Sequence, residues 1–292
     1  MLREIADLGF THAELSHGIR ITLVPGILQA VEQGVIRISS THNFCPLPAG
    51  VLQAAPNLHE PSAQDCRERE QWLRQTKRTI DFSTQMAARV VVLHLGRVDF
   101  FWLNPAHSLR CHLRKHPGID VTQDHGYQHT LARARNRLRK KAEPFWNCAK
   151  AGLAEIFDYA GQKNLRLGIE NREKFDELPL DDEITPYLES LPAGTPAGAW
   201  HDTGHACIKQ KLGVINHKQH LEKSAARLLG FHLHDVNAQG QDHQALGAGG
   251  VDFGMVSRFW QREHILVLEL NPRVSVEEVI VSKARVESLM QP

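Results

Sequence analysis

The chain has no long apolar run, no paired-cysteine motif and no large excess of charge of one sign. None of its apolar segments reaches the ~20 residues that span a bilayer, and Met1 leads directly into Arg3, Glu4 and Asp7 rather than into a signal peptide. The five cysteines are scattered without a CxxC pair, a pattern typical of reduced thiols. The formal net charge of +1 disfavours a whole-protein field that would attract nucleic acid. We therefore expect a cytoplasmic protein with neither a membrane-spanning segment nor a nucleic-acid partner.

The chain also lacks a GxSxG motif, so nothing supports a Ser-His-Asp nucleophile. What it does have is 18 histidines in a chain of otherwise ordinary globular composition, 42% hydrophobic and 23% charged. Histidine is the commonest metal ligand in proteins. Most of these histidines are expected at the surface, so their positions must decide which of them matter.

Short apolar segments alternate with helical patterns along the chain, and this order predicts parallel βα units. The expected strands cover residues 10–15, 35–44, 90–96, 165–170, 197–202, 228–234 and 265–270. They predict an α/β fold, a (β/α)8 TIM barrel over residues 1–292 as a single domain, with the first strand missing from the N-terminus. Either the gene start lies upstream of Met1, or the barrel is open on one side.

Several expectations concern the segments between strands. Ser62 is expected to cap a long helix running to about Arg89. Residues 97–126 show no clear period and predict a long loop over the barrel mouth, within an insertion at about 97–147. Pro144 should kink or split the helix that follows. Ser275 and Glu278 form a capping-box pattern that starts the last helix.

Metal-type ligands stand at the ends of four successive expected strands. They are Glu170, the pair Asp202 and His205, the pair His232 and His234, and Glu269. The carboxyl ends of barrel strands meet at the top face, where such barrels build their active sites. One such residue alone is more often a surface or structural group, but four successive strand ends indicate a site for a divalent cation such as Mn, Mg, Co or Zn. A carboxylate on each flank of that cation suits removal and return of a proton.

With these residues the sequence resembles the xylose isomerase-like TIM barrel family, the sugar phosphate isomerase/epimerase group that also includes the endonuclease IV-type AP endonucleases. The resemblance runs from about residue 1 to 286 and is weakest at 97–147. It implies that the metal ligands are Glu170, Asp202, His232 and Glu269. It also implies that His205 meets substrate or a further metal.

The resemblance extends to further histidines. His42 and His94 match positions where the AP endonucleases hold extra zinc ions, and His243 precedes a family-like Gly-x-Gly stretch at 246–253. Gln241 departs from the nuclease pattern, which has an aspartate there, and Asp242 is one position off. We therefore expect one divalent cation, with a second as an alternative. The expected substrate-lining residues are His42, His94, His234, His243 and Arg273.

The activity that the resemblance implies is a metal-dependent isomerase or epimerase of a small sugar, sugar phosphate or polyol. In it, Glu170 and Glu269 move a proton through a metal-stabilised enediolate, while His205 orients a substrate oxygen. Two alternatives stay open: a zinc-dependent phosphodiesterase of the endonuclease IV type, and a non-catalytic metal- or ligand-binding barrel. The expected partner is a small sugar-like molecule, and the family together with the aromatic residues Phe100, Phe101 and Trp102 suggests a homodimer.

The sequence also contains a run of closely spaced basic residues. It comprises Arg133, Arg135, Arg137, Arg139, Lys140 and Lys141. The run could bind phosphate or nucleic acid. The apolar stripe at helical spacing beside it favours an ordinary solvated helix face.

Overall fold

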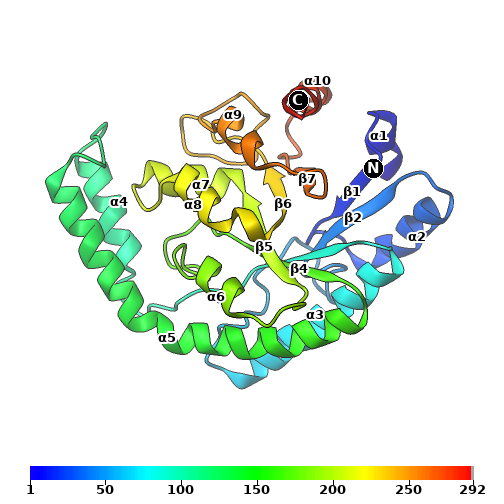
Figure 1. Cartoon of the computed structure of the whole chain (residues 1–292), viewed down its shortest axis with the longest axis horizontal. Helices are drawn as coiled ribbons and strands as arrows, with labels where there is room; N and C mark the ends of the chain where they lie inside the picture. The colour runs from blue at the N-terminus through cyan, green and yellow to red at the C-terminus, as the bar shows by residue number, and fades with distance from the viewer. Residues whose placement is uncertain (291–292) are drawn as a thin grey trace.

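The computed structural model describes residues 1–290, which form seven parallel strands with helices around them (Figure 1). The strands are β1 (His12–Leu15), β2 (Arg37–His42), β3 (Val90–Leu93), β4 (Arg166–Glu170), β5 (Ala197–Asp202), β6 (Leu228–Leu233) and β7 (Ile265–Leu268). Each strand pairs in parallel with the next, in the order β1-β2-β3-β4-β5-β6-β7. This confirms the TIM barrel lacking a first strand that the sequence predicts.

Helices connect the strands and cover the outside of the sheet (Figure 1). They are α1 (Leu2–Asp7), α2 (Val24–Glu32), α3 (Cys66–Gln85), α4 (Pro105–Lys115), α5 (His125–Gln162), α6 (Ile184–Ser190), α7 (Thr203–Lys211), α8 (His217–Ser224), α9 (Phe253–Val256) and α10 (Val276–Leu289). Within residues 1–290, no helix has both the length and the apolar character needed to cross a membrane.

The floor of the barrel is built around one tryptophan of β5. Trp200 is fully buried and packs with Val90, Val92, Leu229 and Ile265. Glycines leave room for the indole, because a Cβ at Gly230 would lie 2.5 Å from its Cζ3 and one at Gly168 would lie 3.1 Å from its Cε3. The ring of His232 lies directly against this floor, with its centroid 5.2 Å from that of Trp200. The apolar floor thus supports the polar residues at the strand ends.

The barrel is open between its first and last strands. No pairing joins β1 to β7 in the part of the chain that the structure describes, and a cavity of about 500 Å³ lies between them. Its lining includes Ala13 and Glu14 of β1, Val267 of β7 and Glu269 just beyond it. This opening between β1 and β7, which we call the open seam, therefore extends from the side of the barrel to residues at its mouth.

Three local expectations can be compared with the structure. Residues 97–126 are not all loop, because α4 forms within them and Asn104 caps it by accepting a hydrogen bond from the Ala106 backbone. Ser62 is not a helix cap: Asp65 caps α3, and the Ser62 hydroxyl bonds the Arg97 backbone instead. The capping box of α10 is confirmed.

Pro144 lies inside α5, which remains one continuous helix of 38 residues. Figure 1 shows α5 changing direction along its length, so the helix bends and is not split. Proline removes one backbone hydrogen bond and crowds the preceding turn, which accounts for a bend. The bend lets one half of α5 lie along α3 while the other half pairs with α4 (Figure 1).

Candidate metal centre

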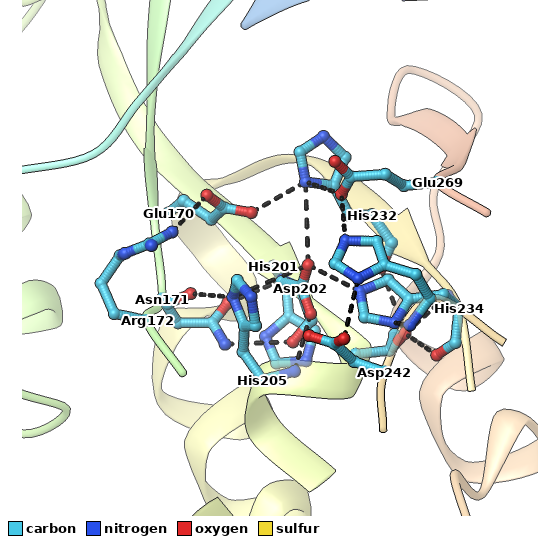
Figure 2. A network of polar contacts seen from close by, with 12 residues as sticks. Glu170, Asn171, Arg172, His201, Asp202, His205, His232, His234, Asp242 and Glu269 are labelled. Atoms are coloured by element: carbon cyan, nitrogen blue, oxygen red, sulfur yellow. Dashed lines mark hydrogen bonds and ion pairs between the residues drawn. The ribbon is translucent and has the colours of Figure 1, made fainter. Parts of the chain in front are cut away.

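Four side chains from the carboxyl ends of four strands meet at the barrel mouth (Figure 2). The four are Glu170 at the end of β4, Asp202 at the end of β5, His232 in β6 and Glu269 just beyond β7. Each offers one ligand atom, and these atoms lie within 4.8 Å of one another. The structure thus brings together the four residues that the sequence suggests as metal ligands.

The imidazole of His232 is the centre of this group, with three carboxylates directed toward its Nδ1 (Figure 2). Nδ1 lies 2.8 Å from Oε1 of Glu170, 3.1 Å from Oε2 of Glu269 and, at greater range, 3.8 Å from Oδ2 of Asp202. Burial lowers the pKa of His232, but the carboxylates of Glu269 and Glu14 outweigh burial and raise it well above its usual value. The pocket is therefore strongly negative, and a proton or a metal cation can neutralise it.

Glu170 is a buried carboxylate that its neighbours keep ionised. Its Oε2 accepts a hydrogen bond from Nη1 of Arg172 at 2.8 Å and lies 2.6 Å from Nε2 of His94. Burial would raise the pKa of Glu170, but His94 and His232 hold it well below its usual range. Arg172, itself buried, also reaches Glu177 at 3.4 Å. A fixed cation thus stands behind Glu170, on the side away from His232 (Figure 2).

Asp202 ends β5 and begins α7. Its Oδ1 accepts a hydrogen bond from the backbone N–H of His205 at 2.7 Å, and its Oδ2 lies 2.9 Å from Nε2 of His234. Burial would raise the pKa of Asp202, but His205 and His234 lower it to about 2. The side-chain amide of Asn171 bonds both the N–H and the C=O of Asp202, at 2.7 and 3.0 Å. The bond from His205 orients the carboxylate of Asp202, and the two bonds to Asn171 hold its backbone in place.

Three further groups of potential ligands adjoin the central four. His42 and His94 join Glu170; His234 and His243 join Glu269; Glu173, His205 and Asp242 form the third. The histidines suggested as substrate contacts therefore all border the central group. Asp242, one position from the residue that would match the nuclease pattern, nevertheless has its carboxylate beside His205.

Arg273 is the one suggested substrate residue that the structure leaves apart. Its side chain is exposed, and within residues 1–290 no ion pair or side-chain hydrogen bond links it to the ligand groups. It lies beyond Glu269 in the turn that precedes α10, where its backbone N–H bonds the side chain of Asn271. The role of Arg273 as a substrate contact therefore stays a prediction.

The central four residues fit a divalent cation by their chemistry. Three carboxylates and one imidazole are the donors that hard and borderline divalent ions prefer. All four side chains approach from rigid strand ends, and Glu170, Asp202 and His232 are at most 1% exposed. Four buried or half-buried acids, counting Glu14, stand near one ring while Arg172 supplies one fixed positive charge. A cation with two positive charges offsets two of the three negative charges that remain.

Sequence reasoning missed Glu14, Arg172 and Glu177. Glu14 lies in β1 between Ala13 and Leu15, and its Oε1 is 2.8 Å from Nε2 of His232. Glu14 stands one residue before the end of the expected strand 10–15, close to the strand-end position that singled out Glu170, so it could have been found. Arg172 and Glu177 lie in the loop after β4, where no periodicity indicates which side chains turn inward.

The chain is similar to known proteins in sequence pattern and in fold. The model of the family described as xylose isomerase-like TIM barrel matches residues 2–280. Among curated proteins, none matches the chain in sequence. A D-tagatose 3-epimerase-like protein of known structure aligns with a TM-score of 0.69 at 16% identity, covering 98% of this chain and 91% of that one.

Two further solved structures are similar. The 3-keto-D-glucoside 4-epimerase from E. coli aligns with a TM-score of 0.65 at 12% identity, covering 98% of this chain and 92% of that one. The D-psicose 3-epimerase from Clostridium cellulolyticum H10, solved with D-tagatose, has a TM-score of 0.65 at 9% identity, with 100% and 93% covered. At these identities the likeness establishes the fold alone.

Proposed function

This chain belongs to the xylose isomerase-like TIM barrel family, and from that premise we propose that it is a divalent-metal-dependent isomerase or epimerase of a small sugar or sugar derivative. The observation that carries the proposal is the pair of carboxylates, Glu170 and Glu269, on either side of His232 Nδ1. The names of the similar structures, all sugar epimerases or proteins like them, support the same class of substrate.

Glu170, Asp202, His232 and Glu269 would hold the cation. When bound, it acts as a Lewis acid that polarises a substrate carbonyl and stabilises enediolate oxygens. Glu170 and Glu269 then take a proton from a substrate carbon and return one, since they approach from different strands. Glu269 is 24% exposed whereas Glu170 is 1% exposed, so Glu269 is the more accessible carboxylate to an incoming substrate.

His205 is proposed to orient a substrate oxygen. Its Nδ1 lies 2.9 Å from the backbone oxygen of Asn171, so that nitrogen is an N–H donor in the neutral ring. Nε2 is then left as the acceptor for a substrate hydroxyl. The same ring borders Glu173 and Asp242, which are half-buried polar groups of the kind that bind sugar hydroxyls.

The test is solvent-deuterium incorporation. The protein with added Mn²⁺ or Co²⁺ is incubated in D2O with ketoses such as D-tagatose and D-psicose, and carbon-bound deuterium is measured by proton NMR. We expect incorporation by the wild type and a ~10²–10⁴-fold slower rate in Glu269→Gln, the range for losing a general acid or base. Glu263→Gln, an exposed carboxylate before β7, is the matched control and should retain the wild-type rate. Full turnover by Glu269→Gln would refute the assignment.

A second function is favoured by one specific observation. The central group adjoins His42 and His94 on one side and His205 with Asp242 on the other, a set with the composition of a multi-zinc site. Such a site suits a zinc-dependent phosphodiesterase. Cleavage of a duplex that carries one abasic site, with no deuterium incorporation into any sugar, would favour this function over the isomerase.

A further inference from the structure

Positive charge is concentrated in one segment of the chain. Residues 105–141 contain nine Lys or Arg and two Asp, a formal charge of +7. The other 255 residues contain 25 Lys or Arg and 31 Asp or Glu, a formal charge of −6. The net charge of +1 is therefore the sum of a strongly basic segment, residues 105–141, and an acidic remainder of the chain. That segment is α4 with the first half of α5, which form a helical hairpin beside the barrel (Figure 1). We propose that it belongs to an insertion at about 97–147 of a single barrel domain.

The hairpin contains a groove that only basic and neutral residues line. The groove has a volume of about 770 Å³, and Lys115, Arg133, Arg137 and Lys140 line it together with His112 and His116. No carboxylate is among its lining residues in the described part of the chain. Within residues 1–290, no salt bridge engages these four Lys and Arg side chains, whereas the neighbouring Arg139 pairs with Asp182 in the acidic remainder of the chain.

The arrangement of the cations is linear. Arg133, Arg137 and Lys140 are spaced i, i+4 and i+7 along α5, so they share one face of the helix over about 10 Å. Lys115 faces them from the last turn of α4. A row of unpaired cations along a groove suits an extended chain of phosphates better than one compact anion.

Aromatic side chains stand at the start of the hairpin. Phe101 and Trp102 are 84% and 79% exposed, and their rings contact each other edge-on at 5.4 Å. The preceding Phe100 lies under the cations of α5, with Lys141 Nζ 4.8 Å and Arg137 Cζ 5.8 Å from its ring centroid. These contacts hold the aromatic segment beside the cation row, where exposed rings can stack on unpaired bases.

We propose that the groove between α4 and α5 binds single-stranded nucleic acid, with Arg133, Arg137 and Lys140 on the phosphates and Trp102 on a base. The exposed rings favour a single strand, because a duplex exposes no unpaired base faces on which they could stack. The site lies away from the barrel mouth and does not depend on the metal centre. The proposal therefore stands or falls independently of the isomerase function.

The test is fluorescence anisotropy with labelled oligo(dT) and oligo(U) of roughly 12 nucleotides, within the site sizes of single-strand binders. The binding variant is Arg133→Gln, Arg137→Gln, Lys140→Gln. The matched control removes the same charge from exposed positions of α3, as Arg67→Gln, Arg74→Gln, Arg78→Gln. Glutamine keeps helix propensity, and the circular dichroism of each variant checks its fold.

We expect the wild type to bind at low salt and the groove variant to bind at least about tenfold more weakly. Its slope of log affinity against log salt should fall by about 2, since three phosphate contacts at ~0.7 each are removed. Trp102→Ala should weaken binding by about tenfold, and the α3 control should bind within about twofold of wild type. Binding of either oligonucleotide supports the proposal, and the stronger of the two shows whether the groove prefers DNA or RNA.

Three results would overturn the proposal. The first is no binding by the wild type at low salt. The second is equal weakening by the groove and α3 variants, which would mean that only net charge matters. The third is equally strong competition by poly-L-glutamate, which would identify the groove as a surface for acidic protein.

Discussion

Oε1 of Glu14 lies 2.8 Å from Nε2 of His232, while Nδ1 of the same ring faces the carboxylates of Glu170 and Glu269. The other oxygen of Glu14 accepts a hydrogen bond from the Ser40 hydroxyl at 2.7 Å, so its orientation is fixed. A carboxylate on one ring nitrogen keeps the other free to bind a metal, because it holds the proton on its own side. Glu14 is therefore positioned to orient His232 from β1, the edge strand of the open seam.

Replacing Glu14 should weaken metal binding without abolishing it. In Glu14→Ala we expect the dissociation constant for Co²⁺ to rise by about 10–100-fold, the usual effect of losing such a partner of a ligating histidine. Titration followed by the visible spectrum of bound Co²⁺ measures it. Glu32→Ala, which removes an exposed carboxylate of α2, should bind as the wild type does. Equal affinity in both variants would contradict this role while leaving the metal centre itself intact.

Arg172 should be important for stability as well as for the site. It is buried and contacts Glu170 and Glu177, so Arg172→Met removes the guanidinium partner of two buried carboxylates. We expect a loss of about 3–5 kcal/mol in the free energy of unfolding, measured by urea denaturation. The control is Arg139→Met, which breaks an exposed pair with Asp182 and should cost less than about 1 kcal/mol. Similar losses in the two variants would contradict the account of the buried network.

The floor under the site should not tolerate a methyl group at Gly230. A Cβ there would lie 2.5 Å from Trp200 Cζ3 and 2.6 Å from the backbone oxygen of Ile265. Overpacking of this kind costs about 1–3 kcal/mol, so the melting temperature of Gly230→Ala should fall. Gly26→Ala in α2, where nothing lies within 4 Å, should instead raise it slightly. A rise in both variants would show that the floor yields to the added methyl.

Glu60 should make stability depend on pH away from the metal centre. Burial raises its pKa to about 7, from a usual value near 4.5. The folded state therefore holds the proton more tightly, and the stability that protonation contributes is lost as pH rises from 4.5 through 7. Glu60→Gln should raise the melting temperature by roughly 2–4 °C at pH 8 and leave it unchanged at pH 4. The same increment at both pH values would contradict the raised pKa.

The strands and the ligand residues were predictable because local patterns encode them. Val90 to Leu93 is apolar on both faces, as a strand of a parallel sheet must be, and Glu170 and Glu269 mark strand ends. The helix α4 was not predicted, since its buried residues Ala106 and Leu109 are too few to give a clear period among polar neighbours. Arg172 and Asp242 were beyond local reasoning, because their contacts depend on how loops fold back over the mouth.

The measurement that tests the central claim most directly is the metal content of the protein purified without added metal or chelator, by mass spectrometry. The account predicts about one equivalent of manganese, cobalt, magnesium or zinc per chain, lost in Asp202→Asn, which removes one carboxylate of the central group. Two or three zinc ions per chain would favour the phosphodiesterase function over the isomerase function. A wild-type protein that holds no divalent metal, and binds none when Mn²⁺, Co²⁺ or Zn²⁺ is added, would contradict the account.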